Sequence, residues 1–142
     1  MLIRPFTSED KTAVIELWRK CDLLRPWNDP EKDINRKLAS SPELFLVGVL
    51  DGKICASAMA GYEGHRGWVN YLAVDPDVQN SGMGRRIMSE VESRLLNLGC
   101  PKINVQIRSS NSNAVEFYEK IGYSTDEVIS VGKRLIKDGG GQ

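Results

Sequence analysis

The feature that most constrains this chain is a strand-like run that passes through a glycine-rich loop into an amphipathic helix, all within residues 68–98. Residues 68–74 are mostly apolar and favour a strand, which Asp75-Pro76 ends. Apolar residues then recur at spacings of three and four, as a helix with one buried face requires: Ile87, Val91, Leu95 and Leu98. The segment predicts a strand–loop–helix unit on which the rest of the chain packs.

The connecting loop, residues 79–84, reads Gln-Asn-Ser-Gly-Met-Gly. Its glycines permit positive φ and remove Cβ atoms, so backbone N–H groups can approach a ligand closely. The first N–H groups of a helix lack intrahelical partners, and the helix dipole places roughly +0.5 charge there, which favours phosphate. Arg85 and Arg86 oppose this dipole, and a bound anion would explain them. A glycine-rich connection without a ligand is the alternative.

Two common phosphate loops do not fit this stretch. A P-loop requires Gly-Lys-Ser/Thr at the helix start, where this chain has Gly84 followed by two arginines. The dinucleotide fingerprint requires a third glycine, and Ile87 stands at that position. The phosphate ligand must therefore be of another kind.

The pattern Gln79-x-x-Gly82-x-Gly84 resembles the pyrophosphate-binding motif of the GNAT superfamily of acyl-CoA-dependent N-acyltransferases. The loop departs from that superfamily's commonest form, because Gln-Asn-Ser replaces a basic, glycine-rich start. Residues 21–30 are more narrowly similar to the YpeA-type bacterial acetyltransferases. A second superfamily motif, Asn-x-x-Ala-x-x-Phe-Tyr-x-x-x-Gly-Phe, is similar to the spacing of Asn111, Ala114, Phe117, Tyr118, Gly122 and Tyr123.

The resemblance implies an α+β (α/β mixed) fold, the GNAT fold. Its sheet is mixed and mostly antiparallel, with six to seven strands flanked by helices, and strands 4 and 5 are splayed to admit acetyl-CoA. The sequence pattern itself predicts the order β-α-α-β-β-β-α-β-α-β, with an Asp51-Gly52 hairpin. We predict a single domain over residues 1–136 and a flexible tail over 137–142. Strands are expected at 2–6, 44–50, 54–61, 68–74, 102–108 and 125–133, and helices at 7–21, 29–39, between Gly84 and Gly99, and at 111–121.

Composition excludes several classes of protein. The 19 basic and 19 acidic residues cancel, so no overall field favours nucleic acid or an anionic membrane. No apolar run approaches the ~20 residues of a membrane span, and polar residues occupy the N-terminus where a signal peptide would be apolar. A cytoplasmic protein is expected. Three scattered cysteines and one histidine favour neither a disulfide framework nor a metal site.

The resemblance also implies how acetyl-CoA is held. The pantetheine arm would pair with the backbone of Leu72 and Val74, and an N–H near Leu72 would polarise the acetyl carbonyl. Arg85 would compensate the pyrophosphate charge. Tyr118 would protonate the departing thiolate, although packing on the fifth strand is the alternative for this side chain. The predicted coenzyme-binding residues are Leu72, Ala73, Val74, Gln79, Asn80, Ser81, Gly82, Met83, Gly84, Arg85, Asn111 and Tyr118.

The acceptor side is less determined by the sequence. In this fold the first two helices and their connection vary with the acceptor, so acceptor contacts would come from Asp22, Arg25, Trp27 and Asp29; a capped, solvated turn is the alternative. Glu63 is our prediction for the catalytic base, next to the single histidine His65, and a mobile hairpin tip is the alternative. Other candidates for the base are His65, Asn70, Tyr71 and Asp22.

The resemblance implies an N-acetyltransferase, an acyltransferase enzyme that moves an acetyl group from acetyl-CoA to a primary amine. The amine belongs to a small molecule or to a peptide or protein N-terminus, and attacks directly in a ternary complex. The alternative is a catalytically silent GNAT-fold module that binds acyl-CoA as a sensor or in an interaction. We expect no metal, no nucleic acid and no membrane partner, and allow for a homodimer.

Overall fold

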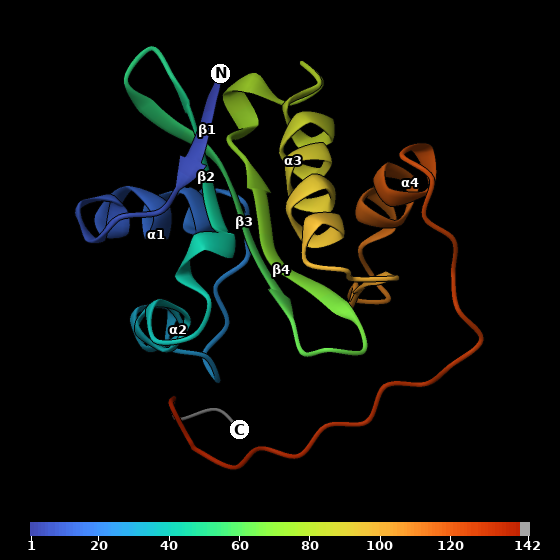
Figure 1. Cartoon of the computed structure of the whole chain (residues 1–142). Coiled ribbons are helices and arrows are strands. Elements are labelled where there is room, and N and C mark those ends of the chain that lie inside the picture. The colour runs from blue at the N-terminus through green and yellow to red at the C-terminus, as the bar shows by residue number, and fades with distance from the viewer. Residues whose placement is uncertain (140–142) are drawn as a thin grey trace.

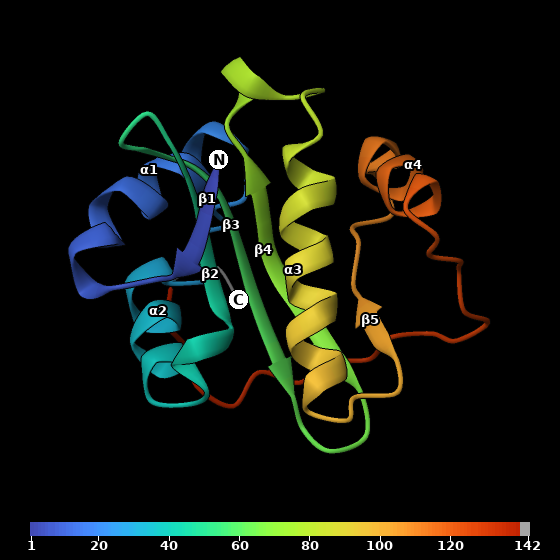
Figure 2. The same cartoon turned by 45° about the horizontal axis from the view of Figure 1, so that its top comes forward.

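The computed structural model of the chain describes residues 1–139, which form one five-stranded sheet with helices on both faces. Its strands are β1 (Leu2–Pro5), β2 (Phe45–Leu50), β3 (Lys53–Tyr62), β4 (Gly67–Val74) and β5 (Ile103–Val105). Its α-helices are α1 (Lys11–Lys20), α2 (Pro30–Leu38), α3 (Met83–Asn97) and α4 (Ser112–Lys120). Helices α1 and α2 lie on one face of the sheet, and α3 and α4 lie on the other (Figures 1 and 2).

Local sequence signals begin α2 and the hairpin between β2 and β3 where they were predicted. The Asp29 side chain accepts a hydrogen bond from the Lys32 N–H at 3.1 Å, which caps α2, and Pro30 occupies its first position. Asp51 and Gly52 both have positive φ, 51° and 77°, as the tight turn between β2 and β3 requires. Both predictions are confirmed.

The sheet separates two apolar clusters, because successive strand residues point to opposite faces. Phe45 and Val47 of β2 pack with α1 around Trp18, while Leu46 packs with α3 around Val91. All five side chains are almost completely buried. Trp18 is therefore a core residue on the α1 side of the sheet.

Strand β4 contains a bulge that the sequence did not reveal. Its register against β3 shifts, so that Ser57 lies opposite Ala73 but Met59 lies opposite Asn70. Tyr71, within the shifted segment, has a φ of +53°. An extra residue in one strand reverses the alternation of its side chains. Tyr71 and Ala73 therefore pack on the α1 side of the sheet.

A buried polar chain holds this bulge in place. The indole N–H of Trp18 donates to Ser57 Oγ at 2.9 Å, and the Ser57 hydroxyl donates to the Tyr71 carbonyl at 2.8 Å. The Trp18 and Tyr71 rings also stack, with centroids 3.8 Å apart and planes 10° from parallel. Since each buried polar group is satisfied, the backbone at Tyr71 is fixed by the core and not only by its own strand.

Strands β4 and β5 are parallel and pair only at one end. Gly67 lies opposite Ile103 and Val69 opposite Val105, and beyond these residues the two strands have no paired positions. The remaining part of β4, up to Val74, therefore faces an opening in the sheet. The predicted separation of strands 4 and 5 is seen here, although β5 is shorter than the predicted strand over 102–108.

The prediction of six to seven strands is wrong for the described residues, where the sheet has five. The segment 125–133, predicted as a final strand, has no strand structure. Its β-favouring residues Val128, Ile129 and Val131 are 78%, 89% and 87% exposed. A strand needs a backbone partner and a face to bury, and this segment has neither among residues 1–139.

The same segment contacts β5 and the residue after it through side chains. Asn104 donates to Asp126 at 2.7 Å, and Gln106 donates to Ser130. The chain then runs on in extended form toward α2 (Figure 1), where Asp138 pairs with Arg36. Of the predicted flexible tail, residues 140–142 lie outside the described part of the chain.

Candidate active site

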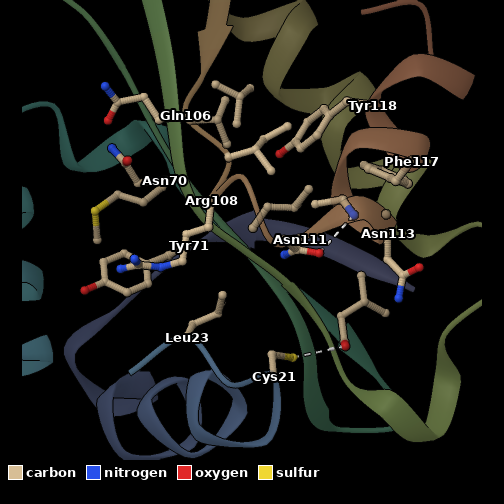
Figure 3. Close-up of a pocket in the computed structure, with 18 of the residues that line it drawn as sticks. Cys21, Leu23, Asn70, Tyr71, Gln106, Arg108, Asn111, Asn113, Phe117 and Tyr118 are labelled. Carbon is tan, nitrogen blue, oxygen red and sulfur yellow. Dashed lines mark hydrogen bonds between the residues drawn. The ribbon is translucent and has the colours of Figure 1, made fainter. Parts of the chain in front are cut away.

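A cavity opens where β4 and β5 diverge (Figure 3). Its volume is about 1600 Å³, compared with roughly 300–1,000 Å³ for a typical small-ligand pocket. One side is formed by β4, the loop before α3, the segment after β5 and α4; the other is formed by the α1–α2 connection and α2. This space is large enough for an elongated ligand with a second molecule beside it.

The N-terminus of α3 forms part of the cavity wall. Gly82, at φ +82°, precedes the helix, and its carbonyl accepts the first helical hydrogen bond from the Arg86 N–H at 3.1 Å. The N–H groups of Met83, Gly84 and Arg85 therefore have no intrahelical acceptor. All three residues line the cavity. This arrangement of donors favours an anion, as the sequence predicted.

Gly82 and Gly84 are required for different structural reasons. A Cβ on Gly82 would meet nothing within 4 Å, so its positive φ alone requires glycine. A Cβ on Gly84 would lie 3.0 and 3.1 Å from two ring carbons of Phe117. Gly84 is therefore needed for the close packing of α3 against α4, in addition to any approach of a ligand.

The two arginines that follow the loop point to different places. Arg85 lines the cavity and donates to the Lys120 carbonyl, at the end of α4, at 3.4 Å. Arg86 is not part of the cavity wall and donates to the Met1 carbonyl at 3.0 Å. Of these two arginines, only Arg85 is placed to compensate the charge of a ligand in this cavity.

Tyr118 of α4 reaches the cavity from within the core. Its side chain is 6% exposed, and its ring makes edge contacts with Phe117 and Tyr123 at centroid distances of 5.1 and 5.3 Å. Figure 3 shows its hydroxyl directed into the open space. Within residues 1–139 this hydroxyl has no hydrogen-bond partner, and burial raises the pKa of the phenol. A neutral donor with a free proton faces the cavity.

The edge of β4 offers backbone groups that are partly used by side chains. The Val74 carbonyl accepts from the Gln79 side-chain amide at 2.9 Å and from the Cys21 thiol at 3.2 Å. Burial raises the pKa of the Cys21 thiol, so this cysteine is a donor and not a reactive thiolate. A ligand that pairs with Val74 must share this carbonyl with Gln79 or displace its amide.

The structure brings most of the predicted coenzyme-binding residues together. All of them line the cavity except Ala73, which is buried on the α1 side, and Ser81, whose hydroxyl donates to the Val78 carbonyl. The Asn111 side-chain oxygen accepts from the Ala114 N–H at 3.1 Å and caps α4 (Figure 3). Its side-chain NH₂ group is left to face a ligand.

The candidates for a base are divided between two places. Asn70, Tyr71 and Asp22 line the large cavity, whereas Glu63 and His65 do not. Glu63 lies in the β3–β4 turn, where its carboxylate accepts the N–H groups of His65 and Arg66. These bonds lower the pKa of Glu63, which makes its carboxylate a weaker base.

Several cavity residues were not predicted. Helix α2 contributes Asp33, Arg36 and Lys37, and the Tyr71 hydroxyl donates to Asp33 at 2.6 Å. Across the opening, the Arg108 guanidinium lies 5.2 Å from the centre of the Trp27 ring. No sequence motif marks Asp33, Arg36, Lys37 or Arg108, because they meet only through the packing of distant segments. Trp27 was predicted as an acceptor contact, and it does not itself line this cavity.

Comparisons with known proteins agree with this geometry. The sequence profile of the Acetyltransferase (GNAT) family matches residues 12–123. The chain belongs to the GNAT acetyltransferase family. An acetyltransferase of Pectobacterium atrosepticum is 50% identical over 138 residues, covering 97% of this chain and 98% of that protein.

Solved structures agree with the GNAT fold. The aminoglycoside 6′-N-acetyltransferase AAC(6′)-IG of Acinetobacter haemolyticus superposes with a TM-score of 0.75 at 17% identity, covering 96% of this chain and all of that one. The ribosomal-protein-S18-alanine N-acetyltransferase of Escherichia coli gives 0.70 at 23% identity, covering 85% and 76%. At such identities these likenesses concern the fold alone, and the YpeA-type subgroup stays a prediction.

No helix in residues 1–139 is long and apolar enough to cross a membrane. Nor does this part of the chain bring three histidine, cysteine or acidic side chains together as a group that could hold a metal ion. All three cysteines are free thiols.

Proposed function

We propose that this protein transfers the acetyl group of acetyl-CoA to a primary amine of a small molecule or of a peptide or protein N-terminus. The observation that carries the proposal is the position of Tyr118. Its free hydroxyl faces the same cavity as the unpaired N–H groups at the start of α3. The same cavity thus offers N–H groups that suit a phosphate and a hydroxyl that can give a proton to a leaving group.

Different residues of this chain would bind different parts of acetyl-CoA. The N–H groups of 83–85 would hold the pyrophosphate, with Arg85 adding charge and the Asn111 NH₂ group adding a donor. The Leu72 and Val74 backbone would pair with the pantetheine arm as an added strand. The bound acetyl-CoA supplies the acetyl group as a thioester, which an amine can attack.

The bulge in β4 would orient the backbone at the reacting carbonyl. Because Trp18 and Ser57 fix Tyr71, the N–H of the next residue, Leu72, is held in a rigid position. A rigid N–H aimed at a developing oxyanion stabilises the transition state. Tyr118 would then donate its proton to the departing sulfur as the C–S bond breaks and the C–N bond forms.

The base that removes the ammonium proton stays a prediction. For Glu63 the role requires a relay past Asn70, because the carboxylate lines only the smaller groove beside that residue. Its hydrogen bonds to the turn oppose the role by lowering its pKa. Asp22 lines the main cavity, so among the carboxylates predicted as candidates for the base it is the one with direct access to that cavity.

The proposal is tested by measuring the thiol released from acetyl-CoA across a panel of primary amines, with product mass determined for each. We expect thiol release that depends on the amine and an acetylated product 42 Da heavier, as expected when acetyl replaces a hydrogen. Saturable acetyl-CoA binding without amine-stimulated thiol release would support the alternative, a silent acyl-CoA-binding module. The absence of acetyl-CoA binding would refute both.

Two further expectations belong with this proposal. A homodimer is supported by the exposed apolar side chains of the segment 125–136, among them Val128, Val131 and Leu135. Light scattering of the wild type beside Val131→Asp tests it, since a dimer built on this segment should dissociate in the variant. Cytoplasmic location stays a prediction that fractionation of cells would check.

A further inference from the structure

The last described residues of the chain place a carboxylate on Arg36 of α2. The two guanidinium nitrogens of Arg36 donate to the two oxygens of Asp138 at 2.7 and 2.8 Å, a bidentate pair. The Asp138 side chain is only 1% exposed. Arg134 also donates to Asn28 at 3.0 Å, so this segment is anchored on the α1–α2 connection as well.

Arg36 belongs to the wall of the active-site cavity. Its guanidinium lies 3.5 Å from Asp33, and Asp33 accepts the hydrogen bond of the Tyr71 hydroxyl. Tyr71 is the bulge residue of β4, next to the backbone where the acetyl carbonyl is expected. The Arg36 guanidinium is therefore connected to the reacting centre through the Asp33 carboxylate and the Tyr71 side chain.

The acceptor side of the cavity carries more positive than negative charge once Asp138 is set aside. Arg25, Arg36 and Lys37 line this side, which the α1–α2 connection and α2 form, together with the two carboxylates Asp22 and Asp33, and Arg108 lies across the opening. Lys37 is half-buried, forms no ion pair within residues 1–139, and has its pKa lowered by desolvation. Its Nζ also lies 3.6 Å from the position that a Cβ on Gly61 would take, close to the sheet.

The two carboxylates on this side are already engaged. Asp33 is held by Tyr71 and Arg36, and Asp22 pairs with Arg25 at 3.5 Å. The charge of Asp33 is therefore offset by Arg36, and the charge of Asp22, whose side chain is 94% exposed, is largely screened by water. An anion on Arg36 would take the place of the Asp138 carboxylate in the same bidentate pair, with a guanidinium that is 47% exposed and therefore only partly screened by water.

We propose that Arg36 binds a carboxylate or phosphate of the amine acceptor, and that Asp138 occupies this position as an internal competitor in the free protein. The inference rests on the proposed acetyl transfer and names the class of acceptor. Because the Tyr71 side chain and Asp33 separate the cation from the reacting centre, the acceptor's anion is remote from its amine. An acceptor with the carboxylate adjacent to the amine does not span this separation.

The first test compares acceptors that differ in this one group. The probes are 6-aminohexanoate, 6-aminohexyl phosphate, the neutral 6-aminohexanamide and norleucine, whose carboxylate adjoins the amine. We expect kcat/KM for the remote anions to exceed that of the amide by about tenfold or more, as a charged hydrogen-bonding pair supplies. Whichever of 6-aminohexanoate and 6-aminohexyl phosphate has the larger kcat/KM carries the preferred anion.

Variants separate the anion site from general effects on the enzyme. Arg36→Gln should bring the ratio of anionic to neutral acceptors close to one, whereas Arg19→Gln, on the exposed part of α1, should leave it unchanged. Asp138→Asn should lower KM for 6-aminohexanoate several-fold and not KM for the amide. Glu127→Gln, in the same C-terminal segment, is its matched control.

A second measurement does not depend on activity. Trypsin cleavage after Arg134 reports release of the C-terminal segment, so Asp138→Asn and Arg36→Gln should both accelerate it relative to Glu127→Gln. Addition of 6-aminohexanoate should accelerate cleavage of the wild type but not of Arg36→Gln, at matched ionic strength and with the amide as control.

The outcomes distinguish the two proposals. Acetylation of neutral and anionic amines at equal kcat/KM, unchanged in Arg36→Gln, would overturn the anion site and leave the acetyltransferase standing. Acetylation of no amine would refute the acetyltransferase, and the cleavage experiment would then decide the anion site alone. Cleavage that 6-aminohexanoate and 6-aminohexyl phosphate leave unaltered would overturn it.

Discussion

Replacement of Tyr118 by phenylalanine separates a catalytic hydroxyl from a packed ring. If the hydroxyl protonates the leaving sulfur, its loss should lower kcat and leave KM for acetyl-CoA nearly unchanged. General acids typically contribute about 10²–10⁴-fold. The leaving thiolate is already stable, with a reference pKa near 8.5, so we expect the lower end, about 100-fold, equivalent to about 2.7 kcal/mol of barrier.

The structure predicts that this variant stays folded. The hydroxyl has no partner within the described residues, so no internal hydrogen bond is lost, and the ring keeps its contacts with Phe117 and Tyr123. The free energy of unfolding should change by less than about 0.5 kcal/mol. Urea denaturation measures this change beside the kinetics.

Tyr123→Phe is the matched control, because its ring packs in the same cluster but does not line the cavity. The Tyr123 hydroxyl donates to Glu92 at 2.7 Å, so its removal should cost about 1 kcal/mol of stability with no effect on kcat. The two variants should therefore show opposite patterns. An unchanged kcat in Tyr118→Phe, with acyl transfer demonstrated as the slow step, would refute the assignment of Tyr118 as the acid.

Three further predictions follow from the loop, the bulge and the N-terminal ion pair. Gly82→Val forces a β-branched residue to φ +82°, and calorimetry should show strongly weakened coenzyme A binding in a protein that remains folded. Ser57→Ala leaves the buried Trp18 N–H without its acceptor, so urea denaturation should show a loss of about 1–3 kcal/mol, accompanied by a lower kcat. Hydrogen bonds from Arg4 lower the pKa of Asp10, so its stabilisation is complete above the unfolded value near ~3.9 and is lost as pH falls through the folded pKa. Arg4→Gln should flatten the acid side of the stability–pH profile, and an unchanged profile would contradict that attribution.

The parts of the site that were predictable from sequence are those made by local chemistry. Gly82 requires a positive φ whatever surrounds it, and Asn111 caps a helix through the N–H three residues on. Such signals depend on neighbours in the chain, so they remain readable without the fold. The Asp51-Gly52 turn and the Asp29 cap belong to the same class.

The parts that were not predictable arise from contacts between distant segments. A run such as 68–74, in which every residue except Asn70 is apolar, shows no regular alternation of polar and apolar residues, so it cannot reveal that Tyr71 takes positive φ and reverses the faces of β4. The bulge depends on Trp18 and Ser57, which are far apart in the chain. Asp33 and Arg36 likewise read as ordinary polar residues of an amphipathic helix until α2 is placed beside Tyr71.

The segment 125–133 shows that a local sequence preference can also predict an element that the structure does not form. Its β-favouring residues are a sound local signal, but a strand exists only where a second backbone pairs with it. Here β5 ends at Val105, and the segment meets that edge through Asp126 and Ser130 side chains. Local preference therefore predicted a strand that the described residues do not form.

Gly84 joins the two motifs that the sequence presents separately. A glycine before a helix was read as a need for close backbone approach to phosphate, but a Cβ there would press on the Phe117 ring at 3.0 Å. Phe117 is the neighbour of Tyr118. The absence of a Cβ at Gly84, in the first turn of α3, therefore sets how closely α4 and the Tyr118 hydroxyl approach the cavity. A side chain at Gly84 would disturb the acid as well as the phosphate site. The glycine at position 84 in the first motif and the Phe117-Tyr118 pair in the second motif therefore act together to set the distance between α3 and α4.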